Sequence, residues 1–220
     1  MKVGPAKGAL SCVITAGDLT TRNYSVRRGE TLALVSRCAM MGATLVQIRE
    51  KALEGRQLFQ LVRSAVRETK ETGIRVLVND RFDIALAAGA HGVHLTSDPI
   101  PVEVVRRKTP EDFVIGISTH RLDELEGARE SGADYAVFGP VFETPGKSGA
   151  EGPKGLETLR SVCEQLFPFP VLALGGIDAK NYRSALDAGA SGIAAIRLFA
   201  DPWDSGQVLG SISRYQKRAE

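Results

Sequence analysis

Residues 41–48 read MGATLVQI, a glycine–alanine pair followed at once by a run rich in apolar and β-branched residues. Similar stretches recur as AGAHGVHL at 88–95, SGADYAVF at 131–138 and AGASGIAAI at 188–196. A glycine in the left-handed conformation commonly ends a helix, and a small alanine lets the chain turn closely into the strand that follows. Each copy therefore predicts a junction between a helix and a strand.

The spacing between the copies predicts the number of repeating units. It runs from 43 to 57 residues, which suits two strand–helix units for each copy, so four copies predict eight units. The strands are expected to be short and mostly apolar, as parallel strands covered on both faces are. They are predicted at Leu10–Thr15, Thr44–Arg49, Arg75–Val78, Gly92–Leu95, Phe113–Ile117, Tyr135–Phe138, Val171–Leu174 and Gly192–Ile196.

The stretches between these strands are amphipathic, and residues 57–72 illustrate the pattern. Leu58, Leu61 and Val62 fall on one face of a predicted helix, whereas Arg63 and Arg67 fall elsewhere. Strict alternation of strand and helix predicts a parallel sheet in an α/β protein. Because no GxGxxG follows the first strand, a closed (β/α)8 TIM barrel is favoured over a doubly wound sheet. No linker-like tract interrupts the chain, so residues 1–220 are expected to form one domain.

Composition excludes several classes of partner. The 28 Lys and Arg against 26 Asp and Glu leave a net charge of +2, which offers no broad attraction for nucleic acid or an anionic membrane. No transmembrane-length apolar run and no secretory signal are present, so a cytoplasmic location is expected. The basic run 106–108 is interpreted as a solvated helix end. Cys12, Cys38 and Cys163 are odd in number and far apart, which predicts buried thiols rather than a disulfide framework or a zinc site.

In a barrel of this type the ligand site lies at the carboxyl ends of the strands. The second strand ends in Gln47, Arg49 and Lys51, alternating residues that are expected to project to one side, where two cations could bind a phosphate. A surface ion pair of Arg49 with Glu50 or Glu54 is the alternative.

The third and fourth strands supply candidate metal ligands. The third ends in Asn79 and Asp80, and Asp98 follows the fourth. Mg2+ prefers oxygen ligands and commonly takes one or two carboxylates together with phosphate oxygens and water. Either aspartate could equally be a helix cap. His94, within the fourth strand, could belong to the site or to the core, and His91 on the opposite rim is interpreted as structural.

The later strands complete the predicted site. The fifth ends in Ser118, Thr119 and His120. Ser118 or Thr119 could cap the next helix. His120 could point into the barrel mouth or onto a neighbouring loop. The long polar loop 139–155 after the sixth strand contains Thr144 and Lys147, which could grip a diphosphate. Gly176 follows the seventh strand, and Ile196 and Arg197 follow the eighth, the usual place for a phosphate in such barrels.

These residues together resemble the thiamine phosphate synthase and TenI superfamily along nearly the whole chain. Six ordered blocks carry the resemblance: VQIREK at 46–51, VNDRFDIA at 78–85, GVHL at 92–95, GISTH at 116–120, GPVF at 139–142 with Thr144 and Lys147, and GGI at 175–177. The resemblance implies that a hydroxymethylpyrimidine diphosphate is joined to a thiazole phosphate, with Mg2+ as cofactor and diphosphate as the leaving group. Other partners than these small molecules are not expected, apart from association into a homo-oligomer.

The resemblance also implies a role for each site residue. Arg49, Lys51, Asn79 and Lys147 would hold the diphosphate, and Asp80 would bind the metal. Gly176 and the loop after Ile196 would hold the thiazole phosphate. Lys147, Ser118 and His120 are the candidate catalytic residues, and Gln47, Thr144 and Arg197 are further candidates for substrate binding.

Three departures from the family pattern keep a second reading open. Pro99 stands where a metal-binding acid is expected, so Asp98 would have to take its place. The TxTK motif of the loop is replaced by Thr144-Pro145-Gly146-Lys147. Arg197 stands where the family commonly has a small residue. A TenI-like thiazole tautomerase, with His120 as the acid and base, is the alternative enzyme. A non-catalytic protein that binds phosphorylated ligands is the third reading. Retention of Asn79-Asp80-Arg81 favours the synthase.

Overall fold

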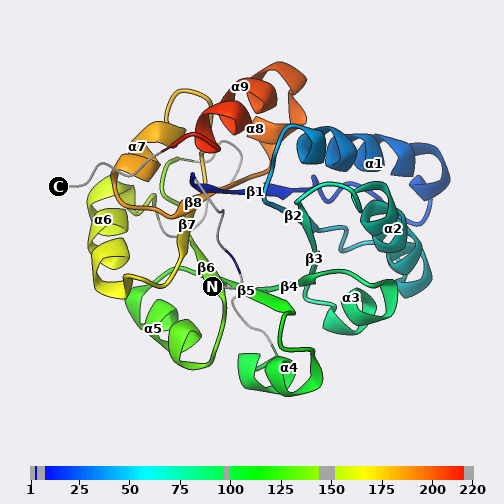
Figure 1. Ribbon diagram of the computed structural model, residues 1–220, viewed down its shortest axis with the longest axis horizontal. Coiled ribbons are helices and arrows are strands. Elements are labelled where there is room, and N and C mark those ends of the chain that lie inside the picture. The colour runs from blue at the N-terminus through cyan, green and yellow to red at the C-terminus, as the bar shows by residue number, and fades with distance from the viewer. Residues whose placement is uncertain (1–2, 4–7, 97–99, 144–151, 216–220) are drawn as a thin grey trace.

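The computed structural model describes residues 3, 8–96, 100–143 and 152–215. Eight strands alternate with helices around them (Figure 1). The strands are β1 (Leu10–Ile14), β2 (Leu45–Ile48), β3 (Arg75–Asn79), β4 (Gly92–Leu95), β5 (Val114–Thr119), β6 (Tyr135–Phe138), β7 (Val171–Leu174) and β8 (Gly192–Ala195). The helices are α1 (Tyr24–Met40), α2 (Gly55–Glu68), α3 (Phe82–Ala88), α4 (Val102–Lys108), α5 (Leu122–Glu130), α6 (Gly155–Leu166), α7 (Tyr182–Asp187), α8 (Arg197–Ala200) and α9 (Pro202–Ile212).

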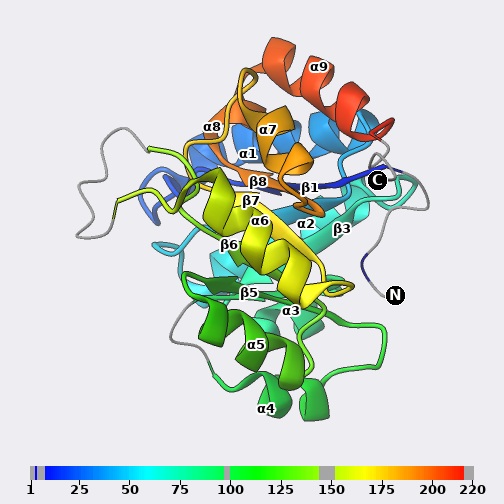
Figure 2. The ribbon, with the colours of Figure 1, turned by 90° about the vertical axis from the view of Figure 1, so that its left-hand side faces the viewer.

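The strands close into a parallel barrel in the order β1 to β8, with β8 paired back to β1. The predicted (β/α)8 barrel is therefore confirmed. Figure 2 shows the barrel from the side, with α5 and α6 in front of the strands. The sequence did not distinguish α8 and α9, two short helices that follow the last strand in place of one.

The glycine–alanine copies mark the junctions that they predict. Gly42, Gly89, Gly132 and Gly189 all have positive φ, between 73° and 98°. A side chain with a Cβ rarely adopts this conformation, so these glycines end a helix where another residue would be strained. The four junctions bring β2, β4, β6 and β8 into the barrel.

Two apolar layers hold the barrel together. One lies between the strands and the helices and includes Val46, Val78 and Ile115. The other fills the barrel interior, where Leu10, Cys12, Ile14, Leu45, Leu77, Val114, Tyr135, Val137, Leu172 and Ala194 pack together with Val3. Cys12, Cys38 and Cys163 are all buried free thiols, as predicted, and burial raises the pKa of Cys12 to about 12.

Several element boundaries and surface roles differ from the sequence predictions. The helix expected over residues 57–72 is α2, which begins and ends earlier, at Gly55 and Glu68. The third strand reaches Asn79, and the fifth runs from Val114 to Thr119, because Thr119 still pairs with Phe138 of β6. Arg106 is not a solvated helix end: it donates to the carbonyl of Phe113 and pairs with Asp134 at 2.6 Å.

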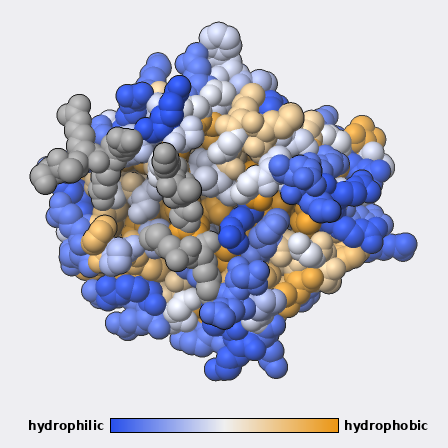
Figure 3. All heavy atoms as spheres, viewed as in Figure 1, coloured by the Kyte–Doolittle hydropathy of each residue, from blue (hydrophilic) through white to orange (hydrophobic). Residues whose placement is uncertain are grey.

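The surface carries mixed polarity. Figure 3 shows hydrophilic residues spread widely over the face viewed in Figure 1, with apolar residues between them. None of the helices in the described part of the chain is long and apolar enough to span a membrane. α4 lies farther from the strands than its neighbouring helices do (Figure 1).

Candidate active site

A chain of buried amides links β2, β3 and β4 at their carboxyl ends. Gln47 donates from Nε2 to Oδ1 of Asn79 at 2.8 Å, and Asn79 donates from Nδ2 to Oδ2 of Asp80 at 2.7 Å. Gln47 and Asn79 are only 3% and 7% exposed, so each amide needs a protein partner. The barrel register pairs Asn79 with His94 of β4, which extends the polar row to the next strand.

Asp80 has a constrained backbone. Its φ of 58° is the one positive value among the described non-glycine residues. The backbone N–H of Asp80 donates to the carbonyl of His94, and the backbone N–H of Thr96 donates to its Oδ1 at 2.8 Å. Lys51 Nζ lies 4.0 Å from Oδ2. The carboxylate is therefore fixed between two loops rather than capping α3, whose N-cap residue is Arg81. Strain of this kind commonly marks a functional position.

Asp80 suits a hard cation as one ligand. Its side chain is 36% exposed, and a fixed carboxylate is the kind of oxygen donor that Mg2+ takes together with phosphate oxygens and water. Among the described residues, no group of three or more His, Cys, Asp or Glu side chains could hold a metal ion. Asp98, the second predicted ligand, lies outside the described residues.

The neighbouring cations differ in their surroundings. Lys51 is exposed, whereas Arg49 is partly buried, and its backbone N–H donates to Oγ1 of Thr15. The alternative of a surface ion pair for Arg49 is not supported, because no such pair forms within the described part of the chain and Glu50 accepts backbone N–H groups instead. Thr144 and Lys147, on the loop after β6, fall among the residues that the structure does not describe.

His94 sits at the centre of a second polar row. Its Nδ1 lies 2.9 Å from the hydroxyl of Tyr135 and its Nε2 lies 3.0 Å from Oγ of Ser118. Burial lowers the pKa of His94 to about 4, and the nearby Asp80 offsets this only in part. The ring is therefore neutral near pH 7, so one nitrogen donates and the other accepts. His94 is buried in the barrel and contacts the candidate site residue Ser118, whereas the sequence had left open whether it lies in the core or in the site.

Ser118 and Thr119 are not helix caps. Both lie within β5; Ser118 contacts His94, and Thr119 donates to the carbonyl of Val137. His120 points to the neighbouring loop, with Nδ1 2.6 Å from the carbonyl of Gly139. A carbonyl only accepts, so Nδ1 of His120 carries a proton and donates this bond. His91 is structural, as expected, and its Nδ1 accepts from the backbone N–H of Val76.

The predicted phosphate cradle lies beside the loop after β6. A Cβ added at Gly176 would stand 2.3 Å from the carbonyl oxygen of Glu143, so only glycine fits where these two loops meet. Ile196 is the N-cap residue of α8, and Arg197 at its start is exposed. This is the place after the eighth strand at which a short extra helix commonly receives a phosphate in such barrels.

A cavity of about 310 Å³ lies between α4 and α5. Its lining includes Val102 and Glu103 of α4, Glu124 and Ala128 of α5, and the end of β5. Two outer helices form most of its walls, and Ser118, whose hydroxyl contacts His94, also lines it.

Comparison with known proteins identifies the family. The model of the thiamine monophosphate synthase family matches residues 18–199, which include every element from α1 to β8. The chain belongs to this family. A thiamine-phosphate synthase of Syntrophomonas wolfei is 37% identical over 81% of this chain and 85% of that protein. One of Clostridium novyi is 41% identical over 70% and 76%.

A solved structure of a similar protein shares the architecture. The thiamine phosphate pyrophosphorylase of Pyrococcus furiosus superposes with a TM-score of 0.74 at 31% identity, covering 93% of each chain. The resemblance read from the six sequence blocks is thereby confirmed.

The sequence analysis missed two residues that hold candidate site residues or a neighbouring loop in place. Tyr135 fixes one nitrogen of His94 and was assigned only to a strand, and Glu50 was considered only as a surface partner of Arg49. Alternation along β6 places Tyr135 on the inner face with Val137, and this pattern could have shown it. The sequence holds no comparable signal for Glu50, because its bonds go to backbone groups 31 to 33 residues away.

Proposed function

We propose that this protein is a thiamine phosphate synthase, which joins a hydroxymethylpyrimidine diphosphate to a thiazole phosphate and releases diphosphate. The observation that carries the proposal is the fixed row from Gln47 through Asn79 to Asp80, with Lys51 4.0 Å from the Asp80 carboxylate. A cation after β2 and a carboxylate after the neighbouring β3 suit a diphosphate and the metal that accompanies it. The names of the relatives agree with this activity.

The residues of the chain would act by binding and orientation. Arg49, Lys51, Asn79 and Lys147 would hold the diphosphate, and Gln47 keeps Asn79 in place. Asp80, with Asp98, would hold Mg2+, which when bound neutralises negative charge on the diphosphate. Gly176, Ile196 and Arg197 would hold the thiazole phosphate, and Thr144 would contact a phosphate. These roles come from the family resemblance and the positions of the described residues.

The reaction transfers the pyrimidine methylene carbon from oxygen to nitrogen. The bond between this carbon and the diphosphate oxygen breaks, and the diphosphate leaves with the electron pair. The thiazole nitrogen then donates its lone pair to the pyrimidine cation. Positive groups around the leaving diphosphate stabilise the charge that develops on it. Ser118, oriented by the neutral His94, is a proposed catalytic contact, together with Lys147 and with His120, which directly follows β5.

The test is turnover of the purified protein with both substrates, with and without Mg2+, with thiamine phosphate followed by chromatography. Metal-dependent product is expected. No product from folded protein would contradict the proposal. Isomerisation of the thiazole carboxylate phosphate without metal, abolished in His120→Ala, would instead support the tautomerase.

The remaining predictions concern the whole chain. The chain is proposed to act as one domain over residues 1–220. A cytoplasmic location and association into a homo-oligomer stay predictions from the sequence.

A further inference from the structure

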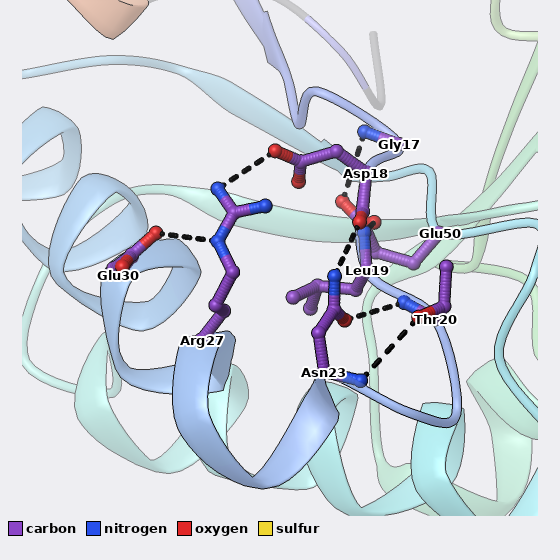
Figure 4. A network of polar contacts seen from close by, with 8 residues as sticks. All are labelled: Gly17, Asp18, Leu19, Thr20, Asn23, Arg27, Glu30 and Glu50. Atoms are coloured by element: carbon purple, nitrogen blue, oxygen red, sulfur yellow. Dashed lines mark hydrogen bonds and ion pairs between the residues drawn. The ribbon is translucent and has the colours of Figure 1, made fainter.

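Glu50 is a buried carboxylate at the end of β2. It is 2% exposed, and a buried charge is costly unless hydrogen bonds satisfy it. Oε1 accepts from the backbone N–H of Gly17 at 3.2 Å, and Oε2 accepts from the backbone N–H of Leu19 at 2.9 Å (Figure 4). Both donors belong to the loop between β1 and α1. The carboxylate therefore fastens this loop to the strand that carries Gln47 and Arg49.

The same loop has its own internal bonds, which keep it compact. Asn23 accepts from the backbone N–H of Thr20 and donates to the carbonyl of Asp18, while Arg27 pairs with the Asp18 carboxylate at 2.8 Å (Figure 4). A bridge between Thr20 and Ala52 gives a second attachment to the segment after β2. At the start of the loop, Thr15 accepts from the backbone N–H of Arg49 itself, and Glu50, the next residue in the chain, holds the loop at Gly17 and Leu19.

The loop backbone at Gly17 lies directly against Arg49. A Cβ added at Gly17 would stand 2.9 Å from Nη1 of Arg49 and 3.0 Å from its carbonyl oxygen. Gly17 also has a φ of 78°, which other residues rarely adopt. The Gly17 backbone therefore forms one wall of the space that the Arg49 guanidinium occupies, and the N–H of Gly17 donates to Glu50.

We propose that Glu50 is a positioning residue for phosphate binding, which acts on Arg49 through the loop between β1 and α1. The inference rests on the proposed function, in which Arg49 binds the diphosphate. Arginine loses much rotamer freedom when it grips a ligand, so a fixed wall that restricts its side chain beforehand strengthens binding. Glu50 itself need not touch the ligand, because both its oxygens are directed to backbone N–H groups.

The first experiment tests the fastening itself and needs no ligand. Hydrogen exchange is compared between wild type, Glu50→Ala, Glu50→Gln and the control Asp201→Ala. Asp201 also accepts two backbone N–H groups, those of Trp203 and Asp204, but at the start of α9. Faster exchange at residues 17–19 is expected in the Glu50 variants and not in Asp201→Ala. Unchanged exchange there would overturn the proposal.

The second experiment measures coupling to Arg49. Binding of inorganic pyrophosphate with Mg2+ is followed by calorimetry in wild type, Arg49→Ala, Glu50→Gln and the double variant. Glu50→Gln keeps the size of the side chain and can still accept one of the two N–H groups. The binding test therefore remains possible even if Glu50→Ala does not fold. We expect about tenfold weaker binding in Glu50→Gln, and no further loss when it is added to Arg49→Ala. If the double variant loses affinity by the product of the two single losses, or if Glu50→Gln binds pyrophosphate as tightly as wild type, Glu50 does not act through Arg49.

Turnover separates this inference from the proposed function. If wild type makes thiamine phosphate, Glu50→Gln should raise KM for the pyrimidine diphosphate and leave KM for the thiazole phosphate unchanged. If wild type makes none, the proposed function fails, whereas Arg49-dependent pyrophosphate binding that weakens in Glu50→Gln would still support the positioning role. A pyrophosphate affinity that is the same in wild type, Arg49→Ala and Glu50→Gln would overturn it.

Discussion

Asn79 is oriented by Gln47: the Gln47 Nε2 group donates to Oδ1 of Asn79 at 2.8 Å and thereby directs the Asn79 Nδ2 group to Asp80. The two residues do not face each other in the ladder, since Gln47 pairs with Leu77 and Asn79 with His94. Their bond runs diagonally between the adjacent strands β2 and β3, and it sets which end of the Asn79 amide faces Asp80.

This bond predicts that removing one of the two amides costs more stability than its removal costs once the other amide is also gone. Gln47→Leu leaves the buried Oδ1 of Asn79 without its donor, so the free energy of unfolding should fall by about 1–3 kcal/mol. Adding Asn79→Leu removes the orphaned group, and the double variant should be less destabilised than the sum of the single variants. Urea unfolding of all four proteins measures this. Strict additivity would show that the two amides do not depend on each other.

Asp80→Asn should separate activity from folding. Asparagine tolerates positive φ and keeps the shape of the side chain, so the protein should still fold. Its NH2 group cannot accept one of the two hydrogen bonds that Asp80 receives, so the free energy of unfolding should fall by about 1–3 kcal/mol. It loses the negative charge proposed for Mg2+, so turnover should fall by orders of magnitude. Asp83→Asn, at an exposed residue paired with Arg81, is the matched control and should keep its activity. Equal rates in Asp80→Asn and wild type would remove Asp80 from the metal site.

The depressed pKa of His94 predicts acid sensitivity. Below pH 6.5 the unfolded chain binds a proton at this residue more readily than the folded protein, whose His94 has a pKa of about 4. Its contribution to stability is therefore complete above pH 6.5 and is lost as pH falls toward 4, with roughly 2 kcal/mol gone at pH 5.

Urea unfolding at pH 7 and pH 5 provides the measurement, with His94→Gln as the reference. The pKa of His91 is also lowered, chiefly by burial, and this residue is present in both proteins, so the difference isolates His94. A loss of stability at pH 5 that is the same in wild type and His94→Gln would contradict the assignment.

The barrel could be predicted because its signals are local. The glycine at each helix end and the apolar run after it occupy fewer than ten residues, and all four junctions appear where they were expected. Strand ends were less certain, because the extent of β5 depends on its pairing with β6, far along the chain.

The candidate site was predictable in its members but not in its connections. Gln47, Asn79 and Asp80 could be read from strand ends, yet the left-handed backbone of Asp80 arises from its contacts with His94 and Thr96. Arg106 was misjudged for a related reason, since its partner Asp134 is 28 residues distant. Side chains that bond to remote backbone groups leave no periodic pattern in the sequence.

The positive φ of Asp80 also restricts how this position can change during evolution. Glycine and asparagine replace the aspartate with the least added backbone strain, whereas glutamate, which keeps the charge, is less suited to this conformation. A lineage that gives up the carboxylate should therefore pass through one of those two residues. Homologues with asparagine or glycine at this position, and with the neighbouring strand ends intact, would then be those that kept the fold while changing the chemistry.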